Sequence, residues 1–209
     1  MKKRISRFML VLAMLTSAVM SAHAGDLEPP PGPVSPTRPP DTCYDNTGSR
    51  FVDCGDGTIK DTVTGLYWLK QASCLPRVSW AEANNSAALL AHGQCGLTDG
   101  SLPGDWRLPT LECPSGHSCT LDLASGELGE LVNLGTANGC GSPALPDMTG
   151  NGCYTHGDPF LAVETNYWSA TTEPSNPIAA WVLMLMSDQA NCINSKATPG
   201  FVWPVRGGY

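Results

Sequence analysis

Cysteine is the residue type in this chain whose number and spacing most clearly imply chemistry. Nine cysteines occur, all of them after residue 42. Thiols at this density in an exported protein normally form disulfides, which close loops and restrict the unfolded chain. Short separations predict three pairs: Cys74 with Cys95, which flank a predicted helix, and Cys113 with Cys119 and Cys140 with Cys153, which bracket turn-rich loops.

The other three cysteines leave two arrangements open. Pairing of Cys43 with Cys54 is favoured, and pairing of Cys54 with Cys192 is its rival. Because nine is an odd number, one cysteine is left without a predicted partner. The sequence alone therefore predicts disulfide chemistry but not a complete connectivity.

Metal binding is the alternative chemistry for these residues. Cys113, His117 and Cys119 are zinc-ligand types at close spacing, but structural zinc sites usually show two separated ligand pairs, so a disulfide is predicted instead. No cofactor is predicted. The alternative is calcium, bound by a set of loop oxygens that could also bind a sugar. That possible ligand loop comprises Asp147, Asn151, Asp158, Glu164 and Asn166.

The N-terminal segment has the pattern of a secretory signal. A basic start at residues 2–7 precedes an apolar run at 8–20, and Ala22-His23-Ala24 supplies the small residues of a cleavage site. The apolar run is shorter than the roughly 20 residues that cross a bilayer. We therefore predict a signal peptide at 1–24, export to the periplasm or the cell exterior, and no membrane insertion.

Removal of that segment makes the chain strongly acidic. It takes away four of the 12 basic side chains and leaves eight against 19 acidic ones, a net charge of about −11. Nucleic-acid binding needs clustered Lys and Arg, so nucleic acid is excluded as a partner. A proline-rich linker is predicted at 25–42, because seven prolines at 29–40 favour an extended spacer.

The folded domain is predicted at 43–209, with short strands and two helices. Alternation and turn signals such as Gly55-Asp56-Gly57 predict strands at 50–54, 58–61, 66–69, 167–170, 180–186 and 201–205. Ser79 and Glu82 form a capping box for one helix, which Gly93 is predicted to close. Ser125 caps a second helix at 126–134, which Gly129 weakens.

Residues 101–166 are rich in Gly, Pro, Ser, Thr, Asn and Asp outside the second helix. A segment of this length without regular structure is usually a functional loop region. The order of strands, helices, a long loop region and further strands predicts an α+β domain.

Several motifs in that order resemble one bacterial family. They are Phe51-Val52-Asp53-Cys54-Gly55-Asp56-Gly57-Thr58, Thr64-Gly65-Leu66-Tyr67-Trp68-Leu69, Gly93-Gln94-Cys95-Gly96-Leu97-Thr98-Asp99-Gly100, Gly104-Asp105-Trp106-Arg107-Leu108-Pro109-Thr110, Tyr167-Trp168-Ser169-Ala170-Thr171-Thr172 and Val202-Trp203-Pro204-Val205-Arg206-Gly207-Gly208. Over residues 50–208 the chain is similar to the Lcl C-terminal domain family, named after the end of a collagen-like adhesin. The resemblance implies a C-type-lectin-like fold akin to the formylglycine-generating enzyme, with small antiparallel sheets, two flanking helices and a long disulfide-stapled loop region.

The resemblance also implies roles for the matched residues. The family's founding member binds sulfated polysaccharide, but a net charge of about −11 counts against a polyanionic ligand here. Core positions are expected for the four matched tryptophans, Trp68, Trp106, Trp168 and Trp203. Arg107 and Arg206 are expected to donate hydrogen bonds to carboxylates or carbonyls within the fold.

No pattern in the chain indicates an enzyme. It contains no Ser/His/Asp order, phosphate-binding Gly-Lys loop or metalloprotease helix, and no cysteine pair stands out as the reactive pair of a formylglycine-generating-type oxidase. We expect a non-catalytic binding or adhesion module that presents its loop surface to a glycan or a surface protein. The alternatives are a structural envelope domain that contacts another protein, and an oxidase relative.

Overall fold

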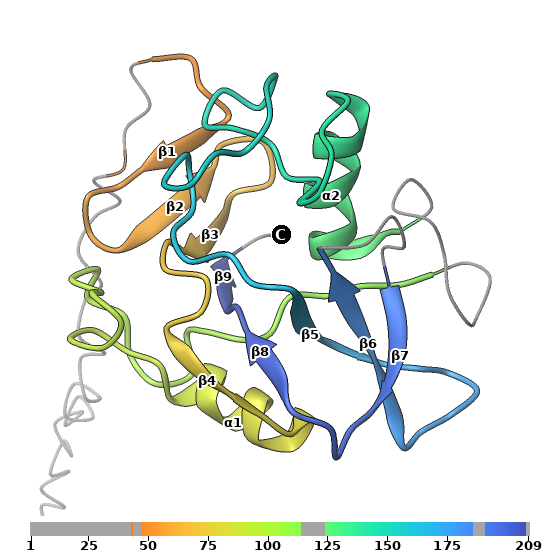
Figure 1. Cartoon of the computed structure of the whole chain (residues 1–209). Coiled ribbons are helices and arrows are strands. Elements are labelled where there is room, and N and C mark those ends of the chain that lie inside the picture. The colour runs from red at the N-terminus through yellow and green to blue at the C-terminus, as the bar shows by residue number, and fades with distance from the viewer. Residues whose placement is uncertain (1–42, 44–46, 114–123, 186–190, 208–209) are drawn as a thin grey trace, which may run out of the picture. The chain divides into compact units, whose positions relative to one another are not determined.

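The structure is a computed structural model that describes residue 43 and residues 47–113, 124–185 and 191–207 (Figure 1). The predicted signal peptide at 1–24 and the linker at 25–42 lie outside the described residues. Within that described part, no helix has both the length and the apolar composition needed to cross a membrane.

A four-stranded antiparallel sheet joins the beginning and the end of the described chain. Its order is β1-β2-β3-β9, with β1 at Phe51–Asp53, β2 at Thr58–Asp61, β3 at Leu66–Leu69 and β9 at Val205–Gly207. The predicted hairpins are confirmed, because Gly55 and Gly57 take the positive φ angles that the tight turn requires. The pairing of β3 with β9 brings the C-terminal strand against the N-terminal meander.

A five-stranded mixed sheet forms the second layer of strands. Its order is β4-β8-β5-β6-β7, with β4 at Leu75–Val78, β8 at Gly200–Val202, β5 at Asn166–Thr172, β6 at Ala179–Met184 and β7 at Asn191–Ser195. β5 and β8 run parallel, and the other neighbours run antiparallel. Strand β6 begins one residue before the strand predicted at 180–186 and ends at Met184. Residue 186 lies outside the described part.

One predicted strand, at 201–205, was wrong. The segment contains two strands, β8 and β9, which belong to different sheets. Pro204 has no N–H to donate to a ladder, so the chain leaves one sheet and enters the other at Trp203 and Pro204. The crossing is held by the Trp203 indole N–H, which donates to the Leu69 carbonyl at 2.9 Å, and by the Leu69 N–H, which donates to the Pro204 carbonyl at 3.1 Å.

The two predicted helices are present with different ends. Helix α1 spans Trp80–Leu89, and the Ser79 N–H donates to the Glu82 carboxylate at 3.1 Å as the capping box requires. Gly93 does not close it: Leu90 is already extended and buried, and Gly93 belongs to the next turn. Helix α2 spans Gly126–Ala137, one turn longer than predicted, and Gly129 is buried with no room for a Cβ beside Ala124.

Two apolar clusters lie on the two faces of the five-stranded sheet. Along β6, Trp181 and Leu183 enter the larger cluster, whereas Ala180 and Val182 enter the smaller one beneath α1. This alternation confirms the prediction that the apolar strand is central and covered on both sides. Rings packed at 4.8–6.4 Å form the centre of the larger cluster: Phe51, Trp68, Phe160, Tyr167 and Trp203.

The four matched tryptophans are all buried, with exposed fractions of at most 1%. Aromatic side chains contribute most of the area in such a core, and each good ring pair adds roughly 0.5–1.5 kcal/mol. The described residues therefore form an α+β fold with two helices, one antiparallel sheet and one mixed sheet.

Candidate functional site

Disulfides hold the loops that surround the two sheets. Three bonds predicted from spacing are present: Cys43–Cys54, Cys74–Cys95 and Cys140–Cys153. The rival pairing of Cys54 with Cys192 is wrong, because Cys54 is bonded to Cys43. Such cross-links reduce the conformational freedom of the unfolded chain and keep the loops in one arrangement.

The predicted Cys113–Cys119 pair falls partly outside the described residues. Cys113 is disulfide-bonded, so its sulfur is not a free thiolate for zinc. Cys119 and His117 lie in the segment 114–123, which the structure does not describe. The prediction of a bond between these two cysteines therefore stays a prediction.

Asp147 organises the loop that Cys140–Cys153 closes. Its Oδ1 accepts from the Thr149 hydroxyl at 2.7 Å and from the Gly152 N–H at 3.1 Å. Burial raises the pKa of this carboxyl, but these hydrogen bonds outweigh burial and the pKa is lowered. From the end of α2, the Asn138 amide donates to the Gly152 carbonyl at 3.1 Å and ties the helix to the same loop.

The five residues of the possible ligand loop are not brought into one site. Asp158 accepts from the Met148 N–H at 2.7 Å and so contacts the same loop as Asp147. The exposed Asn151 lies between them, and its side chain donates to the Thr149 carbonyl. Glu164 and Asn166 lie at the start of β5. Throughout the described ranges, His, Cys, Asp and Glu form no group of three that could hold a metal ion.

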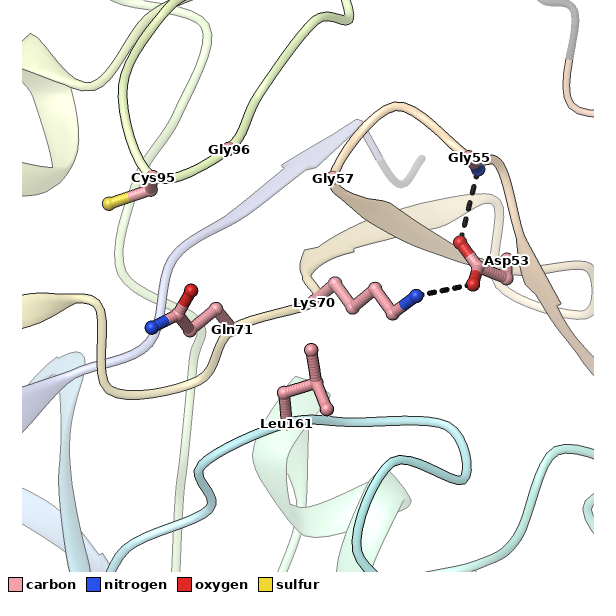
Figure 2. A pocket seen from close by; sticks show the side chains of 8 residues that line it. All are labelled: Asp53, Gly55, Gly57, Lys70, Gln71, Cys95, Gly96 and Leu161. Atoms are coloured by element: carbon pink, nitrogen blue, oxygen red, sulfur yellow. Dashed lines mark hydrogen bonds and ion pairs between the residues drawn. The ribbon is translucent and has the colours of Figure 1, made fainter.

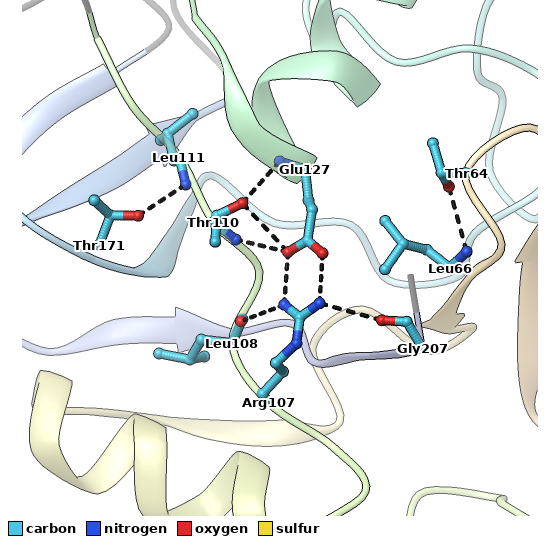
Figure 3. A network of polar contacts seen from close by, with 9 residues as sticks. All are labelled: Thr64, Leu66, Arg107, Leu108, Thr110, Leu111, Glu127, Thr171 and Gly207. Carbon is cyan, nitrogen blue, oxygen red and sulfur yellow. Dashed lines mark hydrogen bonds and ion pairs between the residues drawn. The ribbon is translucent and has the colours of Figure 1, made fainter. Parts of the chain in front are cut away.

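Arg107 joins three segments through a network of hydrogen bonds (Figure 3). Its guanidinium donates to both Glu127 oxygens, at 2.6 and 2.5 Å, and to the Gly207 carbonyl at 3.2 Å. Glu127 also accepts from the Thr110 N–H at 2.9 Å. Hydrogen bonding to Glu127 raises the pKa of Arg107. Burial raises the pKa of Glu127, but its hydrogen bonds outweigh burial and lower it.

Arg206 is held deeper in the protein than Arg107. Its Nε lies 3.0 Å from the Asp99 Oδ2, and the two side chains are only 3% and 0% exposed. The guanidinium carbon lies 4.2 Å from the Tyr67 ring centre and 5.4 Å from that of Trp106. Asp99 accepts from the Ser101 N–H and hydroxyl with its other oxygen. The arginines of two family-like motifs thus contact carboxylates of the protein itself.

Every basic side chain in the described ranges is engaged within the chain. Four form ion pairs with carboxylates, and the others donate to carbonyls or hydroxyls or lie over aromatic rings: Arg50, Lys60, Lys70, Arg77, Arg107, Lys196 and Arg206. A polyanion would have to displace these contacts. The described surface therefore offers no preformed cluster of free positive charge.

A pocket of about 200 Å³ opens where four loops meet (Figure 2). Its walls come from the β1–β2 turn, the segment after β3, the turn that contains Cys95, and the segment before β5. The lining residues are Asp53, Gly55, Gly57, Lys70, Gln71, Cys95, Gly96 and Leu161. Asp53 is the only acidic and Lys70 the only basic residue of this lining.

The two charged groups of the pocket contact each other. The Lys70 ammonium lies 2.5 Å from the Asp53 Oδ2, and the Gly55 N–H donates to the Asp53 Oδ1 at 3.0 Å. Sequence reasoning did not find this site, because Lys70, Cys95 and Leu161 are far apart in the chain. The available signals were the Gly55-Asp56-Gly57 turn and the Cys74–Cys95 spacing, which indicated a hairpin and a bridge but no cavity.

Comparison with known proteins adds no identification. No protein-family model matches the chain, and no curated protein matches it at a significant level.

Proposed function

We propose that the protein is an exported, non-catalytic binding module with a C-type-lectin-like fold, related to the Lcl C-terminal domain family. Its loop region at 101–166 would contact a glycan or a protein at a cell surface. Disulfides in the structure are consistent with an oxidising compartment such as the periplasm or the cell exterior.

The observation that carries this proposal is the anchoring of the described parts of the loop region, residues 101–113 and 124–166. Buried side chains secure it to the core, including Trp106, Leu145 and Phe160, which are at most 1% exposed. Cys140–Cys153 and the Asp147 hydrogen bonds fix its turns. A surface that is already ordered loses little conformational entropy on binding, which favours recognition by an irregular segment.

Electrostatics favours a neutral ligand over a polyanion. The chain without residues 1–24 has eight basic against 19 acidic side chains, a net charge of about −11, and the described basic groups already have partners. Release of an arginine from a carboxylate would leave that carboxylate facing the polyanion. A neutral glycan or a protein surface fits the charge better than the sulfated polysaccharide implied by the resemblance.

A glycan array combined with binding to whole cells tests this function. The oxidised protein is applied with and without calcium to neutral and sulfated glycans, and then to cells treated or not treated with protease. We expect saturable binding to neutral glycans, or to a protease-sensitive cell-surface component. Absence of binding to every target under both conditions contradicts the proposal, and copper-dependent oxidation of a cysteine peptide would instead support an oxidase.

Substitutions locate the binding surface. Leu102→Arg, Asn151→Arg and Glu164→Arg each place a bulky cation in the loop region, and Leu102 and Asn151 are exposed. Val63→Arg is the matched control, because Val63 is 71% exposed on the β2–β3 turn outside that region. We expect at least one of the three variants to weaken binding while Val63→Arg leaves it unchanged. Equal binding by all four variants would place the ligand elsewhere.

A further inference from the structure

The pocket between the β1–β2 turn and the Cys95 turn carries one positive and one negative side chain at its wall (Figure 2). We propose that it binds the zwitterionic head of a free amino acid, with the ligand's ammonium on Asp53 and its carboxylate near Lys70. Leu161 is the one lining residue that belongs to the loop region, and the proposal does not depend on the function proposed for that region.

The Asp53–Lys70 ion pair is exposed enough to exchange partners. The side chains of Lys70 and Asp53 are 28% and 35% exposed, so water reaches both groups. Ion pairs of this exposure contribute about 0–1 kcal/mol, and little free energy opposes their separation. A zwitterion replaces one internal ion pair by two pairs with the ligand, and no charge is left without a partner.

Ligands with a single charge, or with none, fit the pocket less well. A simple anion would pair with Lys70 and leave Asp53 unpaired in a chain that is already acidic, and a simple cation would leave Lys70 unpaired. The pocket lining contains no aromatic residue on which a sugar ring could stack. Among these classes, only the zwitterion satisfies both side chains at once.

The volume and the walls of the pocket set the size of the ligand. Pockets for drug-sized molecules are usually about 300–1,000 Å³, so a volume of about 200 Å³ suits a molecule the size of one amino acid. Gly55 and Gly96 have open space where a side chain would lie, and a ligand can approach their backbone closely. Leu161 and Cys95 supply apolar surface for a small aliphatic side chain.

The pocket walls are held in place by contacts in the protein. The Lys70 N–H donates to the Gly57 carbonyl at 3.0 Å, and the Thr98 N–H donates to the Asp56 carbonyl at 2.8 Å. The Leu161 N–H donates to the Lys70 carbonyl at 2.8 Å, which brings the fourth wall into the same network. Cys95 is cross-linked to Cys74. These contacts preorganise the site and reduce the entropic cost of binding.

An NMR titration of the oxidised protein tests the proposal with glycine, L-alanine and L-leucine as probes. We expect at least one of them to cause saturable shifts of the amide signals of Gly55, Gly57 and Gly96. N-acetyl-L-alanine lacks the ammonium and L-alanine methyl ester lacks the carboxylate, and each should bind about tenfold more weakly than L-alanine, or not at all. Equal binding by the blocked compounds, or no shift with any probe up to about 10 mM, overturns the proposal.

Two variants separate the proposed contacts from a general effect on the fold. Asp53→Asn and Lys70→Met should each weaken binding of the best probe about tenfold or more. Arg77→Met is the control: it removes an exposed cation outside the pocket, whose guanidinium donates to the Pro199 carbonyl, and should bind the probe like the unaltered protein. Unchanged binding in both pocket variants overturns the proposal, and amide spectra of each variant verify that it is folded.

Discussion

Two ion pairs in this protein each join an aspartate to a basic side chain, but they differ in how deeply they are buried. Asp99 and Arg206 lie in the interior with side chains 0% and 3% exposed, and the Arg206 guanidinium lies over the Tyr67 and Trp106 rings. Asp53 and Lys70 lie at a pocket wall with side chains 35% and 28% exposed. The property that we use to separate the two pairs is their access to water.

The difference follows from the cost of leaving a charge without a partner. Removal of one member of a buried pair leaves a charge in a medium of low polarity, whereas an exposed charge is solvated by water. Separation of the interior pair therefore costs much free energy, whereas separation of the pocket pair, which the proposed ligand requires, costs little. Substitutions at these pairs and at the pocket wall test this distinction.

Asp99→Asn should destabilise the protein by about 3–5 kcal/mol, because it leaves the Arg206 charge buried without a counter-charge. The asparagine retains an oxygen that can accept from Ser101, so the loss reports mainly on the charge. Urea unfolding at neutral pH measures it. Lys70→Met is the matched control and should cost less than about 1 kcal/mol. Similar losses in the two variants would contradict the distinction.

Removal of the Cys74–Cys95 bridge should have the next largest effect on stability. A double Cys→Ser replacement at these positions opens a loop with a sequence separation of 21 residues, which should cost about 3 kcal/mol. The midpoint of urea unfolding should fall accordingly. Because Cys95 lines the pocket, its neighbour Gly96 should also show a changed amide signal. If both quantities match those of the unaltered protein, this bridge does not fix the wall.

Gly57→Ala should cost about 2 kcal/mol and test the packing of the pocket wall. Gly57 has a φ of +90°, and an added Cβ would lie 2.6 Å from the Gly96 carbonyl oxygen. Gly55→Ala is the matched control, because Gly55 has a similar φ of +72° with open space around it. The control should lose only about 1 kcal/mol of stability, the cost of a positive φ for a residue with a Cβ. Equal thermal stability of the two variants would show that the close approach to Gly96 does not affect the free energy of unfolding.

Glu127→Gln should reveal the contribution of the Arg107–Glu127 ion pair through its dependence on pH. The pKa of Glu127 is lowered on folding, so the unfolded state binds the proton more tightly and the pair stabilises the protein above the ordinary glutamate value of about 4.3. At neutral pH the variant should lose about 1 kcal/mol, a modest value because the Arg107 side chain is 44% exposed.

The loss caused by Glu127→Gln should disappear as the pH falls through the lowered pKa, because both proteins then carry a neutral side chain at this position. Urea unfolding of the two proteins between pH 7 and about pH 3 measures the difference. A loss that stays constant over that range would show that the Arg107–Glu127 charges do not contribute to it.

Local signals in the sequence predicted the parts of the fold that local chemistry determines. Gly55 and Gly57 marked the first hairpin, and Ser79 with Glu82 marked the start of α1. β4 was not predicted, because Pro76 within it argues against a strand; the structure places it at a sheet edge, where a missing N–H is tolerated. β7 was not predicted either, since asparagines are uncommon in strands.

The long-range contacts could not be predicted. Asp99 and Arg206 belong to separate motifs, and nothing in either motif indicates that the two side chains meet. The pocket likewise depends on where Lys70 and Leu161 lie after folding, because no spacing rule connects positions that far apart. Cysteine spacing was the one long-range signal that succeeded, since a disulfide limits its two partners to contact distance.

Mass-spectrometric peptide mapping without reduction most directly tests whether disulfides hold these loops in an exported protein. The native protein is treated with a thiol-blocking reagent, digested and analysed for cross-linked peptides. The expected result includes three linked pairs among the described residues, Cys43 with Cys54, Cys74 with Cys95, and Cys140 with Cys153. Recovery of these six cysteines as blocked free thiols, or as zinc ligands, would contradict both the preorganised loop region and the oxidising compartment.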